Sequence, residues 1–574
     1  MTTSEYTAGT LTHPPHTSPK GSEILVRELP QRGASWVDWV TTTDHKRIGI
    51  LYLFTTVFFF LVGGVEALLM RIQLGTPDNT FLDPNTYNAL FTLHGTTMIF
   101  LVVVPIAAAF GNYLVPLMIG ARDMAFPRLN MLSWWLLVFG GVVLYASLFF
   151  SPPKSGWTAY APLSESTFLP GHGMDAWILS LHLIGLSSVL GAINFVATIH
   201  NMRAPGMSLS RMPLFVWTIL IYSYLLILAL SSFAATLAML LVDRNFHGTF
   251  FDPTQNGSAL LWQHLFWFMG HPEVYIMVLP AFGMISEIVP VFARKPIFGY
   301  RAIVIATGAI AFLGMLVWAH HMFATPLSTP VLSFFMLSSF AIAVPTGIKI
   351  FNWLATLWRG NIEFRVPLLF AVGFIAQFVI GGATGVILAV FPIDWQLTDT
   401  YFVVAHMHYV LFGGSFFALM AGLYYWFPKM TGRLMSEFWG KVSFWVMVIG
   451  FNLTFLPQHS AGLSGMPRRV FEYHDTGSLH GYNLASTIGS FVLALGVLIS
   501  VGNAVWSVRR GRRAGPDPWL ANTLEWFTTS PPPAHNFDVI PTVRSFEPMK
   551  DIRRRVREQE EQLAAPEPAP EPVG

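Results

Sequence analysis

The sequence predicts an all-α membrane protein, a bundle of twelve transmembrane helices with both termini in the cytoplasm. Three observations support this prediction: 53% of the residues are hydrophobic and only 11% are charged, long apolar runs recur along the chain, and Lys and Arg are concentrated in alternate loops. Soluble globular proteins are much less apolar. The net charge of +2 and the lack of a basic stripe with interleaved aromatic residues give no indication of nucleic-acid binding.

The chain divides into a tail, a bundle and a second tail. Residues 1–40 are rich in Thr, Ser, Pro and Gly and predict a flexible cytoplasmic N-terminal tail. Residues 41–508 predict the twelve-helix domain, and residues 509–574 predict a solvated cytoplasmic C-terminal tail. Each apolar run can cross about 30 Å of hydrocarbon as a helix. In order, the runs lie near residues 48–70, 88–119, 129–150, 176–200, 214–242, 262–291, 301–324, 329–357, 366–390, 400–427, 441–457 and 481–508.

Positive charges between the runs predict the orientation. One set of loops carries twelve Lys and Arg residues, whereas the opposite set carries only Arg71, Lys154, Arg244, Arg468 and Arg469. Cytoplasmic loops carry the excess of Lys and Arg. The richer set is therefore placed in the cytoplasm, and an even number of spans puts both termini there.

Six histidines are predicted to share one depth in the outer part of the membrane. They come from four spans, and such polar groups in lipid need hydrogen bonds or metals. The chain has no cysteine, so any metal is held by His, carboxylate, Tyr or Met. The six are His94, His271, His320, His321, His406 and His408.

The spacing of these histidines separates them into sites. At ~100° per helical residue, His406 and His408 point about 200° apart and serve two different sites. His320 and His321 can share one ion if a third ligand closes the site, and His271 lies at the same depth. Three imidazoles without thiolate suit copper, zinc or non-haem iron, and one or two from helix faces suit haem.

The segment "GHPEVY" adds two further groups beside His271. Tyr275 lies four residues after it on the same face of the helix, where a phenol can supply a proton and an electron. Glu273 is an ionisable group deep in lipid and is therefore a candidate proton relay. The remaining histidines are predicted to bind no metal; His45 is expected to be interfacial or solvated, and His182 and His264 to be hydrogen-bonded core residues.

Four long motifs resemble those of a known family. "WFMGHPEVY", "WAHHMFAT", "VPTGIKIFNWLATL" and "TDTYFVVAHMHYVLFGG" resemble subunit I of the haem–copper oxygen reductases, of the cytochrome c oxidase type with two A-type haems. The resemblance runs from about Trp39 to about Trp506. It implies a terminal oxidase of the bacterial plasma membrane that reduces O₂ to water and pumps protons.

The resemblance also implies roles for the six histidines. His94 and His408 would ligate the iron of the low-spin haem, and His406 the iron of the high-spin haem. His271, His320 and His321 would hold one copper ion. His271, Glu273 and Tyr275 would be catalytic, and in the family the phenol matching Tyr275 is covalently joined to the imidazole matching His271.

Two proton routes follow from the same likeness. The first would run from the cytoplasm to Tyr275 through Ser286, Thr346 and Lys349. The second would begin at Asp123 and reach Glu273 past Asn112, Asn130, Asn194, Tyr52, Ser187 and Ser188. Taken singly, these residues are more often helix caps or interhelical hydrogen-bonders.

The outer rim carries the predicted cofactor contacts. Arg468 and Arg469 would bind haem propionates, Arg71 would bind the formyl group of haem A, and Trp267 would lie beside the haems. The family usually has His-Asp above the haems, but this chain has Thr398 and Asp399. A magnesium site at Asp399 is therefore a weak expectation that needs ligands from another subunit.

The electron donor is expected to be cytochrome c. Positions that bind quinone in quinol-oxidising relatives hold Val62, Glu66, Thr86 and Ala89 here, so only a carboxylate is retained. Without cysteine, this chain needs a subunit II with a dinuclear copper centre, and subunit III and further small subunits are expected. The alternatives are a quinol oxidase with the same core, a nitric oxide reductase, which would lack Tyr275 and Lys349, and a twelve-span secondary transporter.

Overall fold

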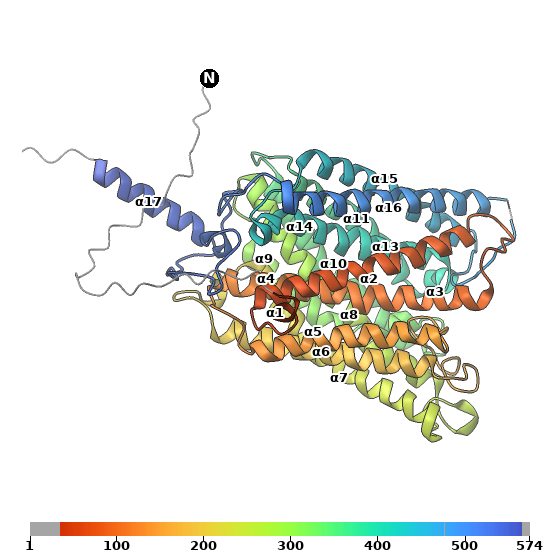
Figure 1. Cartoon of the computed structure of the whole chain (residues 1–574). Coiled ribbons are helices and arrows are strands. Elements are labelled where there is room, and N and C mark those ends of the chain that lie inside the picture. Colours follow the sequence, from red (N-terminus) through yellow and green to blue (C-terminus); the bar gives the residue numbers. More distant parts are fainter. Residues whose placement is uncertain (1–34, 476, 565–574) are drawn as a thin grey trace, which may run out of the picture.

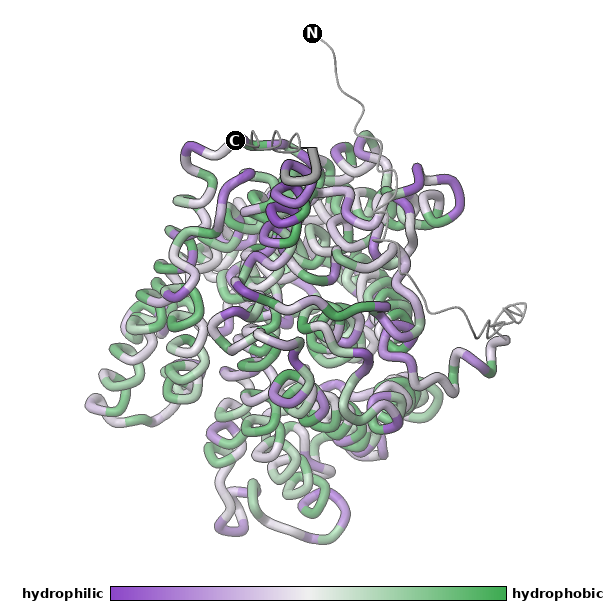
Figure 2. The backbone as a smooth tube through the Cα atoms, turned by 90° about the vertical axis from the view of Figure 1, so that its left-hand side faces the viewer, coloured by the Kyte–Doolittle hydropathy of each residue, from purple (hydrophilic) through white to green (hydrophobic). Residues whose placement is uncertain are grey.

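The computed structural model describes residues 35–475 and 477–564, and all of its named elements are helices. The long helices run roughly parallel, and their connecting loops gather at the two ends of the bundle (Figure 1). Seen from the end that carries α17, the helices are mostly hydrophobic, and hydrophilic stretches concentrate in loops and in α17 (Figure 2). The N-terminal tail predicted over residues 1–40 lies mainly outside the described residues.

Eleven helical segments of the described chain are long and apolar enough to cross a membrane. This confirms an all-helical membrane protein, although one fewer such helix is found than the sequence predicts. The segments are α2 (His45–Gln73), α3 to α4 (Pro84–Ile119), α5 with η2 (Pro127–Phe149), α6 (Gly173–Asn201), α7 (Leu214–Phe246), α8 (Ala259–Ala293), α10 (Thr329–Leu357), α11 (Val366–Leu388), α13 to α14 (Tyr401–Thr431), α15 (Glu437–Leu463) and α16 (Leu479–Arg510). Shorter helices are α1 (Trp36–Val40), α9 (Tyr300–Gly314), α12 (Phe391–Leu397) and α17 (Pro548–Ala564).

The segment predicted as the seventh span, residues 301–324, is broken. It consists of α9 followed by the 3₁₀ turn η5 (Trp318–Met322). The fifteen residues of α9 reach only about 22 Å at ~1.5 Å per residue. The helix ends at Gly314, where an added Cβ would lie 2.6 Å from Cδ2 of Tyr275. The break thus leaves room for Tyr275 and turns His320 and His321 into the bundle.

Two spans contain π-helical segments that the sequence reasoning did not predict. The segment η1 (Thr97–Val103) begins three residues after His94, and η6 (Leu411–Phe416) begins three residues after His408. Such segments occur frequently at functional sites because they change which residues face a neighbouring helix. Both therefore lie immediately beside predicted haem ligands.

Helix α8 forms the centre of the bundle, and its most apolar stretch is entirely buried. It packs against α7, α9, α10, α11 and α14. Helix α8 carries His271, Glu273, Tyr275 and Ser286, and its central position buries His271, Glu273 and Ser286 and leaves Tyr275 half-buried.

Residues 511–547, which we call the C-terminal strap, pack against the end of the bundle rather than extending freely into solvent. Trp526 and Asn536 are buried, and Lys429 donates hydrogen bonds to three strap carbonyls. His45 is also buried; Nδ1 of its ring donates to the carbonyl of Asn112 at 2.6 Å, and Nε2 lies beside the Asn536 amide. The expectation of an interfacial His45 is thus wrong, because its partner is 491 residues away in sequence.

Candidate metal centre and proton routes

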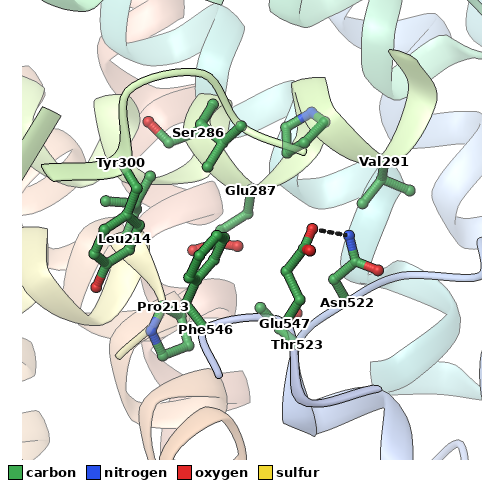
Figure 3. Close-up of a pocket in the computed structure, with 12 residues that line it drawn as sticks. Pro213, Leu214, Ser286, Glu287, Val291, Tyr300, Asn522, Thr523, Phe546 and Glu547 are labelled. Carbon is green, nitrogen blue, oxygen red and sulfur yellow. Dashed lines mark hydrogen bonds between the residues drawn. The ribbon is translucent and has the colours of Figure 1, made fainter. Parts of the chain in front are cut away.

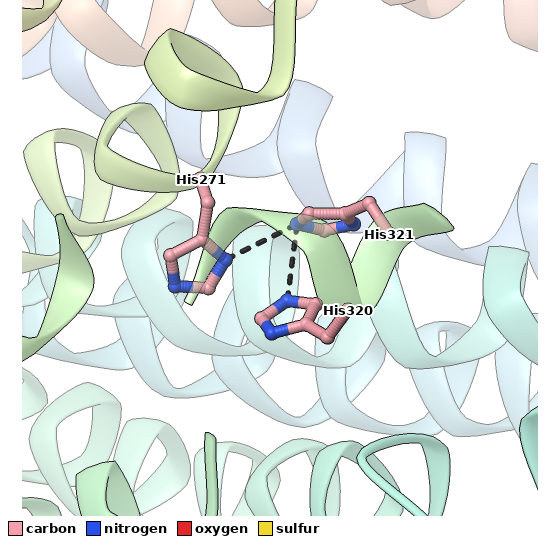
Figure 4. Close-up of side chains that lie close together, drawn as sticks. All are labelled: His271, His320 and His321. Carbon is pink, nitrogen blue, oxygen red and sulfur yellow. Dashed lines mark hydrogen bonds between the residues drawn. The ribbon is translucent and has the colours of Figure 1, made fainter. Parts of the chain in front are cut away.

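Three imidazoles converge at one point in the bundle (Figure 4). Nδ1 of His271 lies 3.1 Å from Nε2 of His321, which lies 3.1 Å from Nε2 of His320. Within the described ranges, no other group of three or more His, Asp or Glu side chains is as compact as this one. Three nitrogens that face one another cannot all be paired by hydrogen bonds among the three neutral rings. A metal ion between them would bind the lone pairs of all three.

Neighbouring side chains fix two of these rings. Nδ1 of His320 lies 2.8 Å from Oγ of Ser339 on α10, and the His321 ring stacks on Trp267 with 3.8 Å between centroids. Trp267 in turn donates its Nε1–H to the Tyr160 hydroxyl at 2.6 Å. Such supporting contacts set the tautomer and orientation of metal-binding imidazoles. Trp267 was predicted to lie beside the haems, and the structure places it against His321.

Tyr275 lies beside the triad as the i, i+4 spacing predicted. Its ring centroid is 4.8 Å from that of His271. Nε2 of His271, on the side of the ring away from the triad, is buried and has no hydrogen-bond partner. This free nitrogen is the atom available to a covalent link with the Tyr275 ring.

His94 and His408 face each other across a gap that suits a metal ion. Their rings are within 13° of parallel, with 6.3 Å between centroids. Two metal–nitrogen bonds of about 2 Å, added to the distance from each nitrogen to its ring centre, give roughly this separation. Nδ1 of His94 bonds to the Gly63 carbonyl and Nδ1 of His408 to the Val404 carbonyl, both at 2.8 Å, so each Nε2 is left free.

His406 projects from the opposite side of α13 to His408. Its Nδ1 lies 3.0 Å from the Gly381 carbonyl and 3.1 Å from Oγ1 of Thr384, both on α11. An added Cβ at Gly385 would lie 2.9 Å from Cε1 of His406, so that glycine makes room for the ring. The predicted division of the two histidines between two sites is therefore consistent with their contacts.

The residues predicted for the second proton route fall into two groups. Tyr52, Asn112, Ser187 and Ser188 line one small cavity, and Ser188 and Glu273 line the next. Each cavity has room for about one water molecule. The Tyr52 hydroxyl donates to Ser133 at 2.8 Å, and sequence reasoning missed Ser133, which lies one turn after Asn130.

At the cytoplasmic mouth, Asp123 lies in the loop between α4 and α5 and is half-buried. Burial is the main cause that raises the pKa of its carboxyl, with the nearby Asp44 carboxylate adding to the effect. Asn194 does not point freely into a route, because its amide makes hydrogen bonds of 2.9 and 3.1 Å to the backbone of Phe126. Asn130 is buried, and neither polar atom of its side chain has a hydrogen-bond partner in the protein, so both could form hydrogen bonds with water.

The residues predicted for the first route lie between α8 and α10. Lys349 is completely buried, its ammonium has no hydrogen-bond partner, and it lies 5.1 Å from the centre of the Phe282 ring. Oγ1 of Thr346 is bonded to its own helix, and Ser286 accepts a hydrogen bond from Trp353 at 3.0 Å. A pocket that includes Ser286 and Glu287 adjoins this group at the end of the bundle, where Glu547 of the strap bonds to Asn522 (Figure 3).

The predicted outer-rim residues are engaged with protein partners. Arg71 donates to Oδ1 of Asn483 at 2.8 Å, and Arg469 donates to Thr158 at 3.2 Å. Burial lowers the pKa of Arg469 to about 10. Asp399 forms an ion pair of 2.5 Å with Arg468, so its carboxylate already has a cationic partner within the chain.

Asp394 of α12 was missed by the sequence reasoning. Burial raises the pKa of its carboxyl to about 7, and the Asp399 carboxylate contributes to the shift. It lies in a short helix between two spans, and only the packing of that helix shows that the carboxyl is buried.

Comparisons with known proteins agree with this geometry. The family model "Cytochrome C and Quinol oxidase polypeptide I" matches residues 47–492. "Cytochrome c oxidase subunit 1" of Bacillus subtilis (strain 168) is 50% identical over 524 residues, covering 91% of this chain and 84% of the relative. "Probable cytochrome c oxidase subunit 1-beta" of Nocardia farcinica (strain IFM 10152) is 53% identical over 518 residues, covering 89% and 87%.

A solved haem–copper terminal oxidase dimer has a TM-score of 0.69 and 18% identity, covering 82% of this chain and 85% of that one, and so supports the fold alone. The family match, together with identities of about one half over most of the chain, shows that this chain belongs to the cytochrome c and quinol oxidase polypeptide I family.

Proposed function

We propose that this chain is the catalytic subunit of a terminal respiratory oxidase that reduces O₂ to water with electrons from cytochrome c and couples the reaction to proton pumping. One observation carries the proposal: a parallel imidazole pair with 6.3 Å between ring centres lies in the same bundle as a separate three-imidazole cluster. His406 and His408, two residues apart on α13, connect the two sets. This arrangement provides for two haems and one copper ion.

The family implies haem and copper, and the residues present fit both groups. His94 and His408 would hold a low-spin haem A, His406 a high-spin haem A, and His271, His320 and His321 the copper ion. When bound, these groups would supply electron transfer and the binding and reduction of O₂. Arg71, Arg468, Arg469 and Trp267 would contact the haem periphery.

The chain's own residues would deliver and hold protons. Tyr275 lies against His271 and would donate a proton and an electron to oxygen reduction. Glu273 is buried with Oε2 unpaired and lines the cavity at the end of the second route, so it would pass on the protons that arrive there. Lys349 is buried and its ammonium has no hydrogen-bond partner, so it would carry protons along the first route toward Tyr275 and the triad.

The membrane placement follows from the same reasoning. We propose that α9 with η5 makes the twelfth crossing, that both termini are cytoplasmic, and that the protein lies in the bacterial plasma membrane. Because the chain has no cysteine, a subunit II would carry the dinuclear copper centre, and subunit III and small subunits would complete the complex. An outer magnesium ion would need Asp399 to exchange its Arg468 partner for ligands from another subunit.

Quinol is the alternative electron donor with the same catalytic core. The retained carboxylate, Glu66, accepts a hydrogen bond from Tyr145, and Thr86 donates its backbone N–H and its hydroxyl to the carboxylate of Asp83, which caps α3. Val62 and Ala89 provide no polar group, so the contacts favour cytochrome c. A secondary transporter of twelve spans would bind its substrate near the midplane rather than at an outer layer of histidines.

A reduced-minus-oxidised spectrum of the purified complex tests the proposed function. We expect bands of two haem A groups, and oxygen consumption that depends on reduced cytochrome c. A spectrum without haem A would contradict the proposal, and sustained turnover with quinol in the absence of cytochrome c would favour the alternative donor.

Replacing Asp123 by asparagine is expected to lower the rate of proton uptake by about tenfold or more, because the group that exchanges protons with the cytoplasm is lost. Stopped-flow measurements with a pH dye on complex in vesicles would record it. Asp538→Asn is the control, since Asp538 is at the same end of the bundle and its side chain is 81% exposed. Equal proton uptake in the Asp123 variant and the wild type would refute the second route.

A further inference from the structure

Glu66 of α2 is a buried carboxyl that neither proton route uses. It is 6% exposed, its Oε1 accepts a hydrogen bond of 3.0 Å from the Tyr145 hydroxyl, and its Oε2 is buried without a partner. No ion pair in the described part of the chain includes it. A carboxylate with so few donors is unfavourable in a membrane interior unless it can take up a proton.

Two connections join Glu66 to the imidazole pair. Gly63 lies one turn before Glu66, and its carbonyl accepts the hydrogen bond of 2.8 Å from Nδ1 of His94. On the other side, the Tyr145 hydroxyl that donates to Glu66 lies 2.8 Å from Oγ1 of Thr97, three residues after His94. Since Tyr145 donates its proton to Glu66, Thr97 is the donor in this second contact.

The helix geometry keeps the carboxyl close to this pair. Residues three apart lie on neighbouring parts of the same helix face, and the rise between Gly63 and Glu66 is only about 5 Å. The same face approaches η1 closely, because an added Cβ at Gly63 would lie 3.0 Å from Cε of Met98. Glu66 is thus on the side of α2 that supports His94.

We propose that Glu66 is a protonation site coupled to the redox state of the low-spin haem held by His94 and His408. The inference rests on the proposed function, since it requires a haem between these two imidazoles. Reduction of the iron adds one negative charge there. A carboxylate within roughly 10 Å in a poorly solvated interior feels that charge and binds a proton more tightly. Reciprocally, a protonated Glu66 favours the reduced haem.

Few other ionisable groups compete at this place. Tyr145 of α5 is in direct contact, and His94 is the nearby titratable group of α3. Tyr87 of α3 packs in a separate cluster around Leu74. Arg71, five residues further along α2, is directed to Asn483 of α16 by its hydrogen bond. Glu66 is therefore the nearest carboxyl on these elements that can compensate the charge change.

The test is a redox titration of the low-spin haem band in the whole complex at several pH values, in the wild type and in Glu66→Gln. Above its pKa, the anionic carboxylate stabilises oxidised iron. In the wild type, the ratio of reduced to oxidised haem at a fixed potential should therefore fall as pH rises, by at most about tenfold per pH unit for one coupled proton. In Glu66→Gln, this pH dependence should fall to less than half, and a carboxyl C=O band should disappear from the redox difference infrared spectrum.

Tyr145→Phe serves as the second variant because it keeps the carboxyl and removes its hydrogen bond. Loss of a donor to the carboxylate disfavours the anionic form, so the pH-dependent range should move to higher pH. An unchanged pH dependence in Glu66→Gln would overturn the inference and leave Glu66 as a tether between α2 and α5. If the Glu66→Gln complex does not assemble, the Tyr145→Phe variant decides the question. A pH-dependent range that is the same in this variant as in the wild type would also overturn the inference. Absence of haem A from the wild type would instead refute the proposed function.

Discussion

Replacing His320 by asparagine is expected to remove copper from the purified complex while both haems remain. His320 supplies one of three nitrogens in the triad, and its ring is already oriented by the contact of 2.8 Å with Ser339. Substitutions of groups that merely support a ligand lower metal affinity by about 10 to 100-fold, and loss of a ligand should exceed this. Oxygen reduction should fall by more than roughly 100-fold, because the site that binds oxygen is incomplete. Metal analysis and the haem spectrum measure the two parts separately.

His264→Asn is the matched control for this experiment. His264 lies on α8 two turns before His271, and its Nδ1 accepts a hydrogen bond of 3.3 Å from Trp318, the first residue of η5. It touches the turn that carries His320 without contributing a nitrogen to the triad. Copper should remain near one per complex in this variant. Full copper occupancy in His320→Asn would contradict the assignment of the triad.

Replacing Lys349 by methionine is expected to slow reduction of the high-spin haem by about 100-fold, the size expected for loss of a proton-transfer group. The side chains have similar length, so the packing against Phe282 should be retained while the ammonium group of this route is removed. Electrons should still reach the low-spin haem at the wild-type rate. Stopped-flow reduction followed at the two haem bands would separate these events.

Lys441→Met controls for the loss of a positive charge. Lys441 is exposed on α15 near the same end of the bundle and should tolerate the change with unaltered reduction kinetics. Normal reduction of the high-spin haem in Lys349→Met would remove the first route from the proposal. It would leave the metal ligands and the Asp123 route unaffected, since these rest on other residues.

The opposite directions of His406 and His408 were predictable because they depend on local geometry. In a helix, residues two apart point away from each other, which places His406 and His408 on different sides of α13. The contacts of His406 with α11 and the facing rings of His94 and His408 agree with this expectation. The i, i+4 spacing likewise placed Tyr275 beside His271.

Other features depend on contacts between distant segments and were not predictable in this way. The apolar run over residues 301–324 is long enough for a span, yet α9 ends at Gly314, where the Tyr275 ring packs so closely that a Cβ would not fit. The polar C-terminal segment suggested a solvated tail, but Asn536 is buried and accepts a hydrogen bond from Lys46 of α2, and the ammonium of Lys429 of α14 lies 5.1 Å from the centre of the buried Trp526 ring. Asn194 was predicted to lie on the second proton route, and the structure adds that its amide forms two hydrogen bonds with the backbone of Phe126, a contact that the sequence did not predict.

The sequence by itself determined the helical membrane class and the opposite directions of His406 and His408, because apolar length and helical periodicity act within a single segment, and its motifs indicated the oxidase family. Only the tertiary structure decided the break in the predicted seventh span after α9, the two π-helical segments beside His94 and His408, the pairing of Asp399 with Arg468, and the link from Glu66 through Tyr145 to Thr97. The physical reason is that a buried polar group takes its partner from whichever element packs against it, and close packing of several helices, not the spacing along one of them, determines that neighbour.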